Sequence, residues 1–98
     1  LEQSDEITYA FSDFEDLLSA AKMAKPYLED KGAVYHYQDR WVLQIEPFEM
    51  EESDFQALIA ILSEYGEATT LTKAVLEEYG KTIIAKNAIS VLCSNFNN

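Results

Sequence analysis

The chain has 98 residues, 18 acidic and 7 basic side chains, and a formal net charge of −11. This length gives room for one domain with a modest core, and no apolar run approaches the roughly 20 residues of a transmembrane helix. The acidic excess disfavours nucleic acid and anionic membrane surfaces as partners, because proteins bind both through basic faces.

A strand and a helix open the chain. Residues 7–11 place large apolar side chains at alternate positions, which is typical of a half-buried strand. Ser12 and Glu15 have the spacing of a capping box, in which each side chain satisfies a backbone donor at the start of a helix. Pro26 lacks a backbone donor, so we expect the helix to end or kink near Lys25.

The next segments, 33–37 and 40–45, are rich in β-formers and flank Gln38-Asp39, which indicates a hairpin. We expect a two-residue loop, because short hairpins favour that length. A three-residue loop would move the tyrosines to the face of Trp41. With the two-residue loop, one face carries Val34, His36, Trp41, Leu43 and Ile45, and the other carries Tyr35, Tyr37, Val42 and Gln44.

Two helices follow the hairpin. Ser53 and Gln56 form a second capping box, and the acidic side chains around them complement the dipole at the helix start. Gly66 is the expected left-handed residue at the end of this helix. A shorter helix is predicted over residues 72–79 and stops at Gly80.

The last predicted elements are a strand over residues 82–84 and a helix capped by Asn87. The order β-α-β-β-α-(α)-β-α indicates an α+β class with a ferredoxin-like βαββα(α)β arrangement, in which helices pack on a four-stranded antiparallel sheet. The additional C-terminal helix carries an apolar stripe, which has to be buried over a sheet edge or on the second face of the sheet.

Catalytic and metal-binding constellations are scarce in this sequence. His36 is the only histidine and Cys93 the only cysteine, and nothing marks them as a base and a nucleophile. A zinc site needs about four ligands, and the three scattered glycines give no phosphate-binding loop. We therefore expect no enzymatic activity, no metal and no cofactor; a hydrolase with paired carboxylates is the enzymatic alternative. The single cysteine fits a reducing compartment such as the cytoplasm.

A five-residue pattern, Leu-x-Glu-Tyr-Gly, occurs at residues 62–66 and again at 76–80. Its Leu, Tyr and Gly have structural explanations in core contact, packing at a helix end and a left-handed cap. The glutamates do not, because an acid near the negative end of the helix dipole costs on the order of a few tenths of a kcal/mol. They are either solvated surface acids or contacts for a partner. The candidate contact residues are Glu64, Tyr65, Glu78 and Tyr79.

The stretch 53–66, followed by 71–81 and 86–88, resembles the C-terminal domain of the MecA adaptor family, which includes MecA and its paralogue YpbH. Phe14-Glu15-Asp16 at the start of the first helix and Tyr35-His36-Tyr37 in the hairpin are similar to that family as well. The resemblance covers nearly the whole chain.

The resemblance implies that residues 1–98 are a single MecA-type C-terminal domain that binds the AAA+ unfoldase ClpC and promotes its assembly into the active hexamer. A separate N-terminal domain of the longer adaptor would collect substrates, which ClpC and ClpP then degrade. We expect this chain to be a fragment without that domain, because it is short and begins with Leu1 rather than a methionine.

An acidic, non-catalytic domain suits a partner with basic patches, where charge sets encounter rate and register. We hypothesise that Glu64 and Glu78 meet basic groups on ClpC. Tyr35, Tyr37 and Val42 form a second candidate surface if the last helix leaves them open. An apolar patch there would serve ClpC or self-association into a homodimer, and the alternative is that another side chain covers it.

Two other classes share the βαββαβ order. A ligand-binding regulatory domain of the ACT type places glycine-rich turns at its ligand site, which this sequence lacks. An RNA-recognition module needs aromatic side chains within a basic surface, which disagrees with a net charge of −11. The ACT-like domain is therefore the main alternative function.

Overall fold

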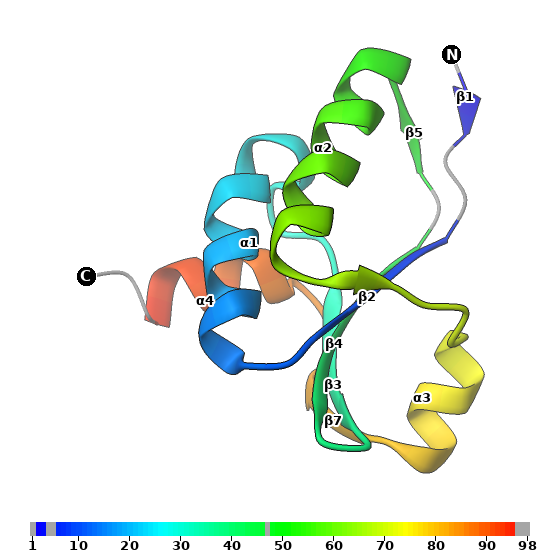
Figure 1. The fold of residues 1–98 in the computed structure, drawn as a ribbon. Coiled ribbons are helices and arrows are strands. Elements are labelled where there is room, and N and C mark those ends of the chain that lie inside the picture. The colour runs from blue at the N-terminus through cyan, green and yellow to red at the C-terminus, as the bar shows by residue number, and fades with distance from the viewer. Residues whose placement is uncertain (1, 4–5, 47, 96–98) are drawn as a thin grey trace.

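A five-stranded antiparallel sheet forms the centre of the fold, with strand order β6-β2-β4-β3-β7 (Figure 1). This computed structural model describes residues 2–3, 6–46 and 48–95. A separate two-stranded sheet pairs β1 with β5. The strands are β1 (Glu2–Gln3), β2 (Ile7–Phe11), β3 (Ala33–Tyr37), β4 (Arg40–Ile45), β5 (Glu49–Met50), β6 (Glu67–Ala68) and β7 (Lys81–Ile84), and the helices are α1 (Phe14–Leu28), α2 (Glu52–Tyr65), α3 (Lys73–Tyr79) and α4 (Ala88–Asn95).

Three helices cover one face of the sheet. α1 packs between α2 and α4, and all three contribute to a single buried cluster with the sheet (Figure 1). Phe11, Leu43 and Leu58 are fully buried in this cluster. The apolar stripe of α4 joins the same cluster through Ile89 and Leu92, so the C-terminal helix packs beside α1 on the first face. We had expected this helix over a sheet edge or on the second face, and that expectation is wrong.

The second face of the sheet is covered by α3, which lies on the opposite side from the other helices (Figure 1). Leu76 of α3 forms a small buried cluster with Tyr35 of β3 and Val42 of β4. Leu71 and Tyr37 pack at its margin. One short helix therefore closes the part of the sheet that the larger core leaves open.

The predicted hairpin register is confirmed. Tyr37 pairs with Arg40 and His36 with Trp41, so the loop consists of the two residues Gln38 and Asp39. These two residues have φ values of 50° and 65°, the left-handed region that a two-residue type I′ loop requires. The cluster on one face contains Val34, Trp41, Leu43 and Ile45, and the cluster on the other face contains Tyr35, Tyr37 and Val42, as the alternation predicts.

The predicted α+β class is confirmed, although the strand count differs from four. The β2-α1-β3 unit has β4 inserted between its strands, as in a ferredoxin-like half. A ferredoxin-like second half would return the last strand beside β2, whereas β7 pairs with β3. The edge beside β2 is already occupied by β6, which forms directly after α2. α3 then crosses the second face and brings the chain to the other edge.

Both predicted capping boxes are wrong. Asp13 occupies the cap position of α1, so Ser12 lies outside the helix, and the side chain of Asp13 makes no capping hydrogen bond. The second helix begins at Glu52, which places Ser53 inside its first turn. There the Nε2 of Gln56 donates to Glu52 at 2.8 Å, so Gln56 supports the turn in a different way.

The other helix boundaries were predicted more closely. Thr72 caps α3 and its hydroxyl accepts a hydrogen bond from the backbone N–H of Val75 at 3.2 Å. Asn87 precedes α4 and its carbonyl accepts a hydrogen bond from the backbone N–H of Val91 at 3.0 Å.

The end of α1 differs from the prediction. Pro26 does not end this helix, which continues to Leu28. A proline within the last turn removes one backbone donor, and the packing of α1 between α2 and α4 tolerates that loss.

Candidate protein-binding surface

The two Leu-x-Glu-Tyr-Gly motifs have the same local structure. In each motif the leucine is fully buried, at Leu62 in α2 and at Leu76 in α3. The glycine N–H then donates to that leucine carbonyl at 2.9 Å in both copies, from Gly66 and from Gly80. A strand begins at the next residue in each case, as β6 or as β7. The motif is therefore a connection from the end of a helix to an edge strand.

The glycines of the motif are extended, and the prediction of left-handed caps is wrong. Gly66 has φ −146° and Gly80 has φ −100°, values open to any residue. Glycine is needed here for a steric reason. A Cβ on Gly66 would lie 2.6 Å from the carbonyl oxygen of Ala10, and a Cβ on Gly80 would lie 2.8 Å from that of Leu76 and 3.2 Å from that of His36. Each helix end is thus pressed against the backbone of the sheet.

The two motifs lie at the same end of the sheet, on opposite edges. Glu67 of β6 pairs with Ala10, and Lys81 of β7 pairs with His36. Ala10 and His36 pair with neighbouring residues near the start of β4, which follows the Gln38-Asp39 loop directly. Both motifs therefore lie near this loop. Four strand spacings separate β6 from β7, or about 19 Å. We call this end of the molecule the hairpin end.

Acidic and aromatic side chains of the motifs are presented to solvent at the hairpin end. Glu64 and Glu78 are exposed, and within the described part of the chain neither forms an ion pair. Tyr79 is 70% exposed, which is unusual for so large a ring. Tyr65 is half-buried, and its hydroxyl donates to the Sδ of Met23 in α1 at 3.3 Å. Two unpaired carboxylates with adjacent tyrosines thus stand at the two edges of one end.

A shallow hollow of about 360 Å³ adjoins the first motif. Glu64 and Tyr65 line it together with Ser12, Arg40 and Glu67. Arg40 is already paired with Glu67 at 2.7 Å. Among the described residues, no cation therefore pairs with the carboxylate of Glu64, although Arg40 lines the same hollow.

The second candidate surface lies mostly inside the protein. Tyr35 and Val42 are buried beneath α3, where they pack with Leu76, and Tyr37 is half-buried at the edge of that cluster. The covering element is α3 rather than the C-terminal helix. Burial raises the pKa of Tyr35 above its usual value, and the charge of Glu77 raises it further. These residues therefore support the fold and do not present an open patch.

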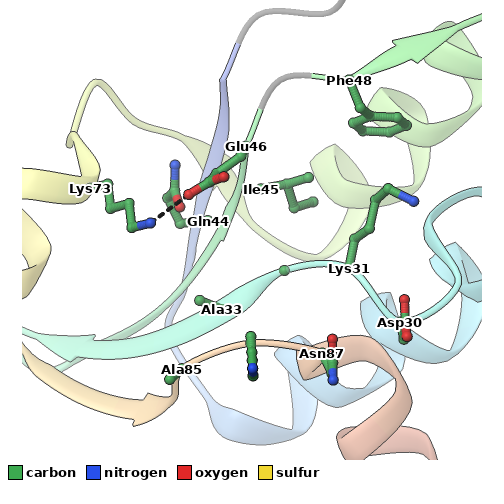
Figure 2. Close-up of a pocket in the computed structure, with 12 residues that line it drawn as sticks. Asp30, Lys31, Ala33, Gln44, Ile45, Glu46, Phe48, Lys73, Ala85 and Asn87 are labelled. Atoms are coloured by element: carbon green, nitrogen blue, oxygen red, sulfur yellow. Dashed lines mark hydrogen bonds and ion pairs between the residues drawn. The ribbon is translucent and has the colours of Figure 1, made fainter.

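A second hollow, of about 450 Å³, lies at the other end of the sheet (Figure 2). Its floor is apolar and includes Ala33 and Ile45. At its margin, Lys73 of α3 forms an ion pair with Glu46 at 2.5 Å (Figure 2). The hydrogen bond from Lys73 to Glu46 raises the pKa of the lysine. The lining comes from separate segments of the chain, residues 30–33, residues 44–46 with Phe48, and residues 85–87, together with Lys73, so no local motif in the sequence could have indicated it.

The described residues contain no group of three or more His, Cys, Asp or Glu side chains that could hold a metal ion. His36 lies against the ring of Trp41, with 4.7 Å between centroids, and Cys93 is half-buried on α4. No described helix has the length and apolar character to span a bilayer. The fold is that of an α+β domain, and its hairpin end carries the four candidate contact residues Glu64, Tyr65, Glu78 and Tyr79.

The comparisons with known proteins assign the family. A family model described as "Negative regulator of genetic competence (MecA)" matches residues 1–92, and the chain belongs to this family. It is 34% identical over 96 residues to "Adapter protein MecA 2" of Bacillus subtilis (strain 168), which covers 98% of this chain and 48% of that protein. It is 30% identical over 89 residues to "Adapter protein MecA" of Oceanobacillus iheyensis, with 91% and 46% covered. The chain thus spans about half the length of the curated relatives it matches.

Solved structures agree with this assignment. The C-terminal domain of YpbH has a TM-score of 0.83 and 33% identity, and covers 96% of this chain and 100% of its own. The C-terminal domain of MecA has a TM-score of 0.84 and 27% identity, with 95% and 99% covered. A chain from a cryo-EM study of the MecA–ClpC complex has a TM-score of 0.77 and 27% identity, with 98% and 100% covered. The matched family is MecA, not the ACT class considered as an alternative.

Proposed function

We propose that this chain is the domain of a MecA-type adapter that binds a ClpC-type AAA+ ATPase and promotes its assembly and activation. Membership of the MecA family supports this, as does a structural relative that was studied in the MecA–ClpC complex. A longer adapter containing this domain would deliver the substrates held by its remaining part to ClpC and ClpP. The free cysteine agrees with a cytoplasmic location for such a protein.

The observation that carries the proposal is the paired placement of the two Glu-Tyr motifs. Glu64 and Glu78 each stand at the unfavourable end of a helix dipole, and no described cation pairs with either. Each has a tyrosine beside it, and tyrosine is among the residues that most often dominate binding energy. Two such pairs at one end give a bivalent surface for a partner with two basic pockets. The net charge of −11 would speed the encounter.

Charge reversal tests this surface. We expect Glu64→Lys and Glu78→Lys each to weaken binding to ClpC at least about tenfold, and the double variant to abolish it, because a buried charge pair becomes a repulsive one. Glu49→Lys is the matched control. It makes the same change in net charge on β5, away from the hairpin end, and we expect it to leave the Kd within about twofold.

The assays are binding by calorimetry, ClpC ATPase activity and hexamer formation by light scattering. Circular dichroism on each variant confirms that the fold is intact. Wild-type affinity in the folded double variant would remove both glutamates from the interface. A wild-type chain that neither binds ClpC nor raises its ATPase activity would overturn the proposed function as a whole.

A further inference from the structure

Met23 of α1 contacts the proposed ClpC-binding surface through Tyr65. The Sδ of Met23 accepts a hydrogen bond from the Tyr65 hydroxyl at 3.3 Å. The side chain of Met23 is exposed, at 47%, whereas Met50, the other methionine of the chain, is half-buried. An oxidisable sulfur that is open to solvent thus accepts a hydrogen bond from Tyr65, the residue next to Glu64.

Oxidation would change this contact strongly. A thioether sulfur is a weak hydrogen-bond acceptor. Hydrogen peroxide converts it to a sulfoxide: the O–O bond breaks, one oxygen bonds to the sulfur, and the other leaves as water. The sulfur is oxidised by two electrons and the peroxide is reduced by two. The product carries a polar S–O group, which a tyrosine hydroxyl binds far better than it binds a thioether.

We propose that Met23 is an oxidation site that controls the position of Tyr65, and through it the affinity for ClpC; this inference rests on the proposed function. In the reduced protein, the weak contact lets Tyr65 leave α1 to meet a partner. In the sulfoxide, the hydroxyl of Tyr65 is held on α1, and polar surface replaces apolar surface beside the motif. Both changes lower the affinity. Reduction of the sulfoxide by a methionine sulfoxide reductase restores it.

The first test is binding before and after limited peroxide treatment. All proteins carry Cys93→Ser, so that the thiol does not react, and mass spectrometry locates the added oxygen. We expect oxidation of the parent to weaken ClpC binding about fivefold, and the reductase to reverse the loss. Met50→Leu should behave like the parent. Met23→Leu should show the same Kd before and after treatment, and an equal loss in this variant would overturn the proposal.

The second test needs no partner, so it separates this inference from the proposed function. NMR follows the ring signals of Tyr65 while the Met23 methyl signal moves to its sulfoxide position. We expect the Tyr65 ring to shift and its ring flips to slow on oxidation of Met23, and Tyr65→Phe to remove the coupling. An unchanged Tyr65 ring would overturn the inference. Failure of the untreated chain to bind ClpC would overturn the proposed function alone.

Discussion

Arg40 of β4 forms an ion pair with Glu67 of β6, with 2.7 Å between Nη2 and Oε1, although β2 lies between the two strands. The residue of β2 that pairs with Glu67 is Ala10, whose small side chain leaves the path open. This contact ties a two-residue edge strand to the centre of the sheet. It also keeps Arg40 from neutralising Glu64 in the neighbouring hollow.

We predict that Arg40→Ala lowers the free energy of unfolding by no more than about 1 kcal/mol, because the pair is exposed to solvent. The local effect is larger. The backbone N–H of Thr69, which donates to Thr8 at 3.0 Å just beyond β6, should exchange faster with deuterium. Lys73→Ala is the control, because it breaks a different exposed ion pair, the one with Glu46, and should leave Thr69 unchanged. Unaltered exchange in Arg40→Ala would mean that β6 holds without this pair.

Substitutions at Gly66 separate the two explanations for this glycine, the predicted left-handed cap and the steric limit set by the backbone of Ala10. A left-handed cap tolerates asparagine better than alanine, whereas a steric limit penalises asparagine more. Since an added Cβ would lie 2.6 Å from the Ala10 carbonyl oxygen, we expect Gly66→Ala to cost about 1–3 kcal/mol and Gly66→Asn to cost more. Urea unfolding measures both. A more stable asparagine variant would restore the cap explanation.

Leu76 is the fully buried residue of α3 on the second face of the sheet. It is fully buried against Tyr35 and Val42, so Leu76→Ala should cost about 2–5 kcal/mol through lost contact and a cavity. Val75→Ala, on the neighbouring half-buried position of α3, is the matched control and should cost less. Thermal unfolding of both variants checks the order. Equal losses would show that the whole helix, rather than Leu76, supports this face.

Much of the fold could be predicted from the sequence, because its signals were local. The hairpin register depends on two adjacent residues, Gln38 and Asp39, and on the alternation in the flanking strands. The end of α3 and its Thr72 cap are likewise set within one turn. The α+β class depends on the order of elements, which periodicity shows directly.

What could not be predicted involves partners far apart in the chain. β6 has only two residues, too few to show alternation, so the strand that displaces β7 to the other edge has no sequence signal. The burial of Tyr35 depends on Leu76, and the contact of Met23 with Tyr65 joins two helices. The repeated motif gave the candidate residues at the hairpin end, but their common position follows from strand pairing.

Tyr79 should affect binding without affecting stability. Its side chain is 70% exposed, so Tyr79→Ala should change the free energy of unfolding by less than about 0.5 kcal/mol. If it anchors ClpC as proposed, the same change weakens binding by about tenfold or more. Ile83→Ala is the control, because Ile83 is also exposed, at 40%, on the edge strand β7. Loss of affinity only in Ile83→Ala would move the interface to the sheet edge.

Alkaline stability should depend on Tyr35. Burial holds the pKa of its hydroxyl above 10.0 in the folded protein, so on raising the pH the unfolded chain loses this proton first. The unfolded state then binds fewer protons than the native state, and stability falls as the pH rises above 10.0. The contribution of Tyr35 is complete below that value and disappears above its folded pKa.

Tyr35→Phe should therefore flatten the decline in the free energy of unfolding, measured with urea at a series of pH values. Lys73 adds to the same decline, because its bond to Glu46 raises its pKa above 10.5, and Lys73→Gln should flatten it separately. Tyr79→Phe removes an exposed tyrosine as the control, and a decline of wild-type steepness in Tyr35→Phe would contradict this account.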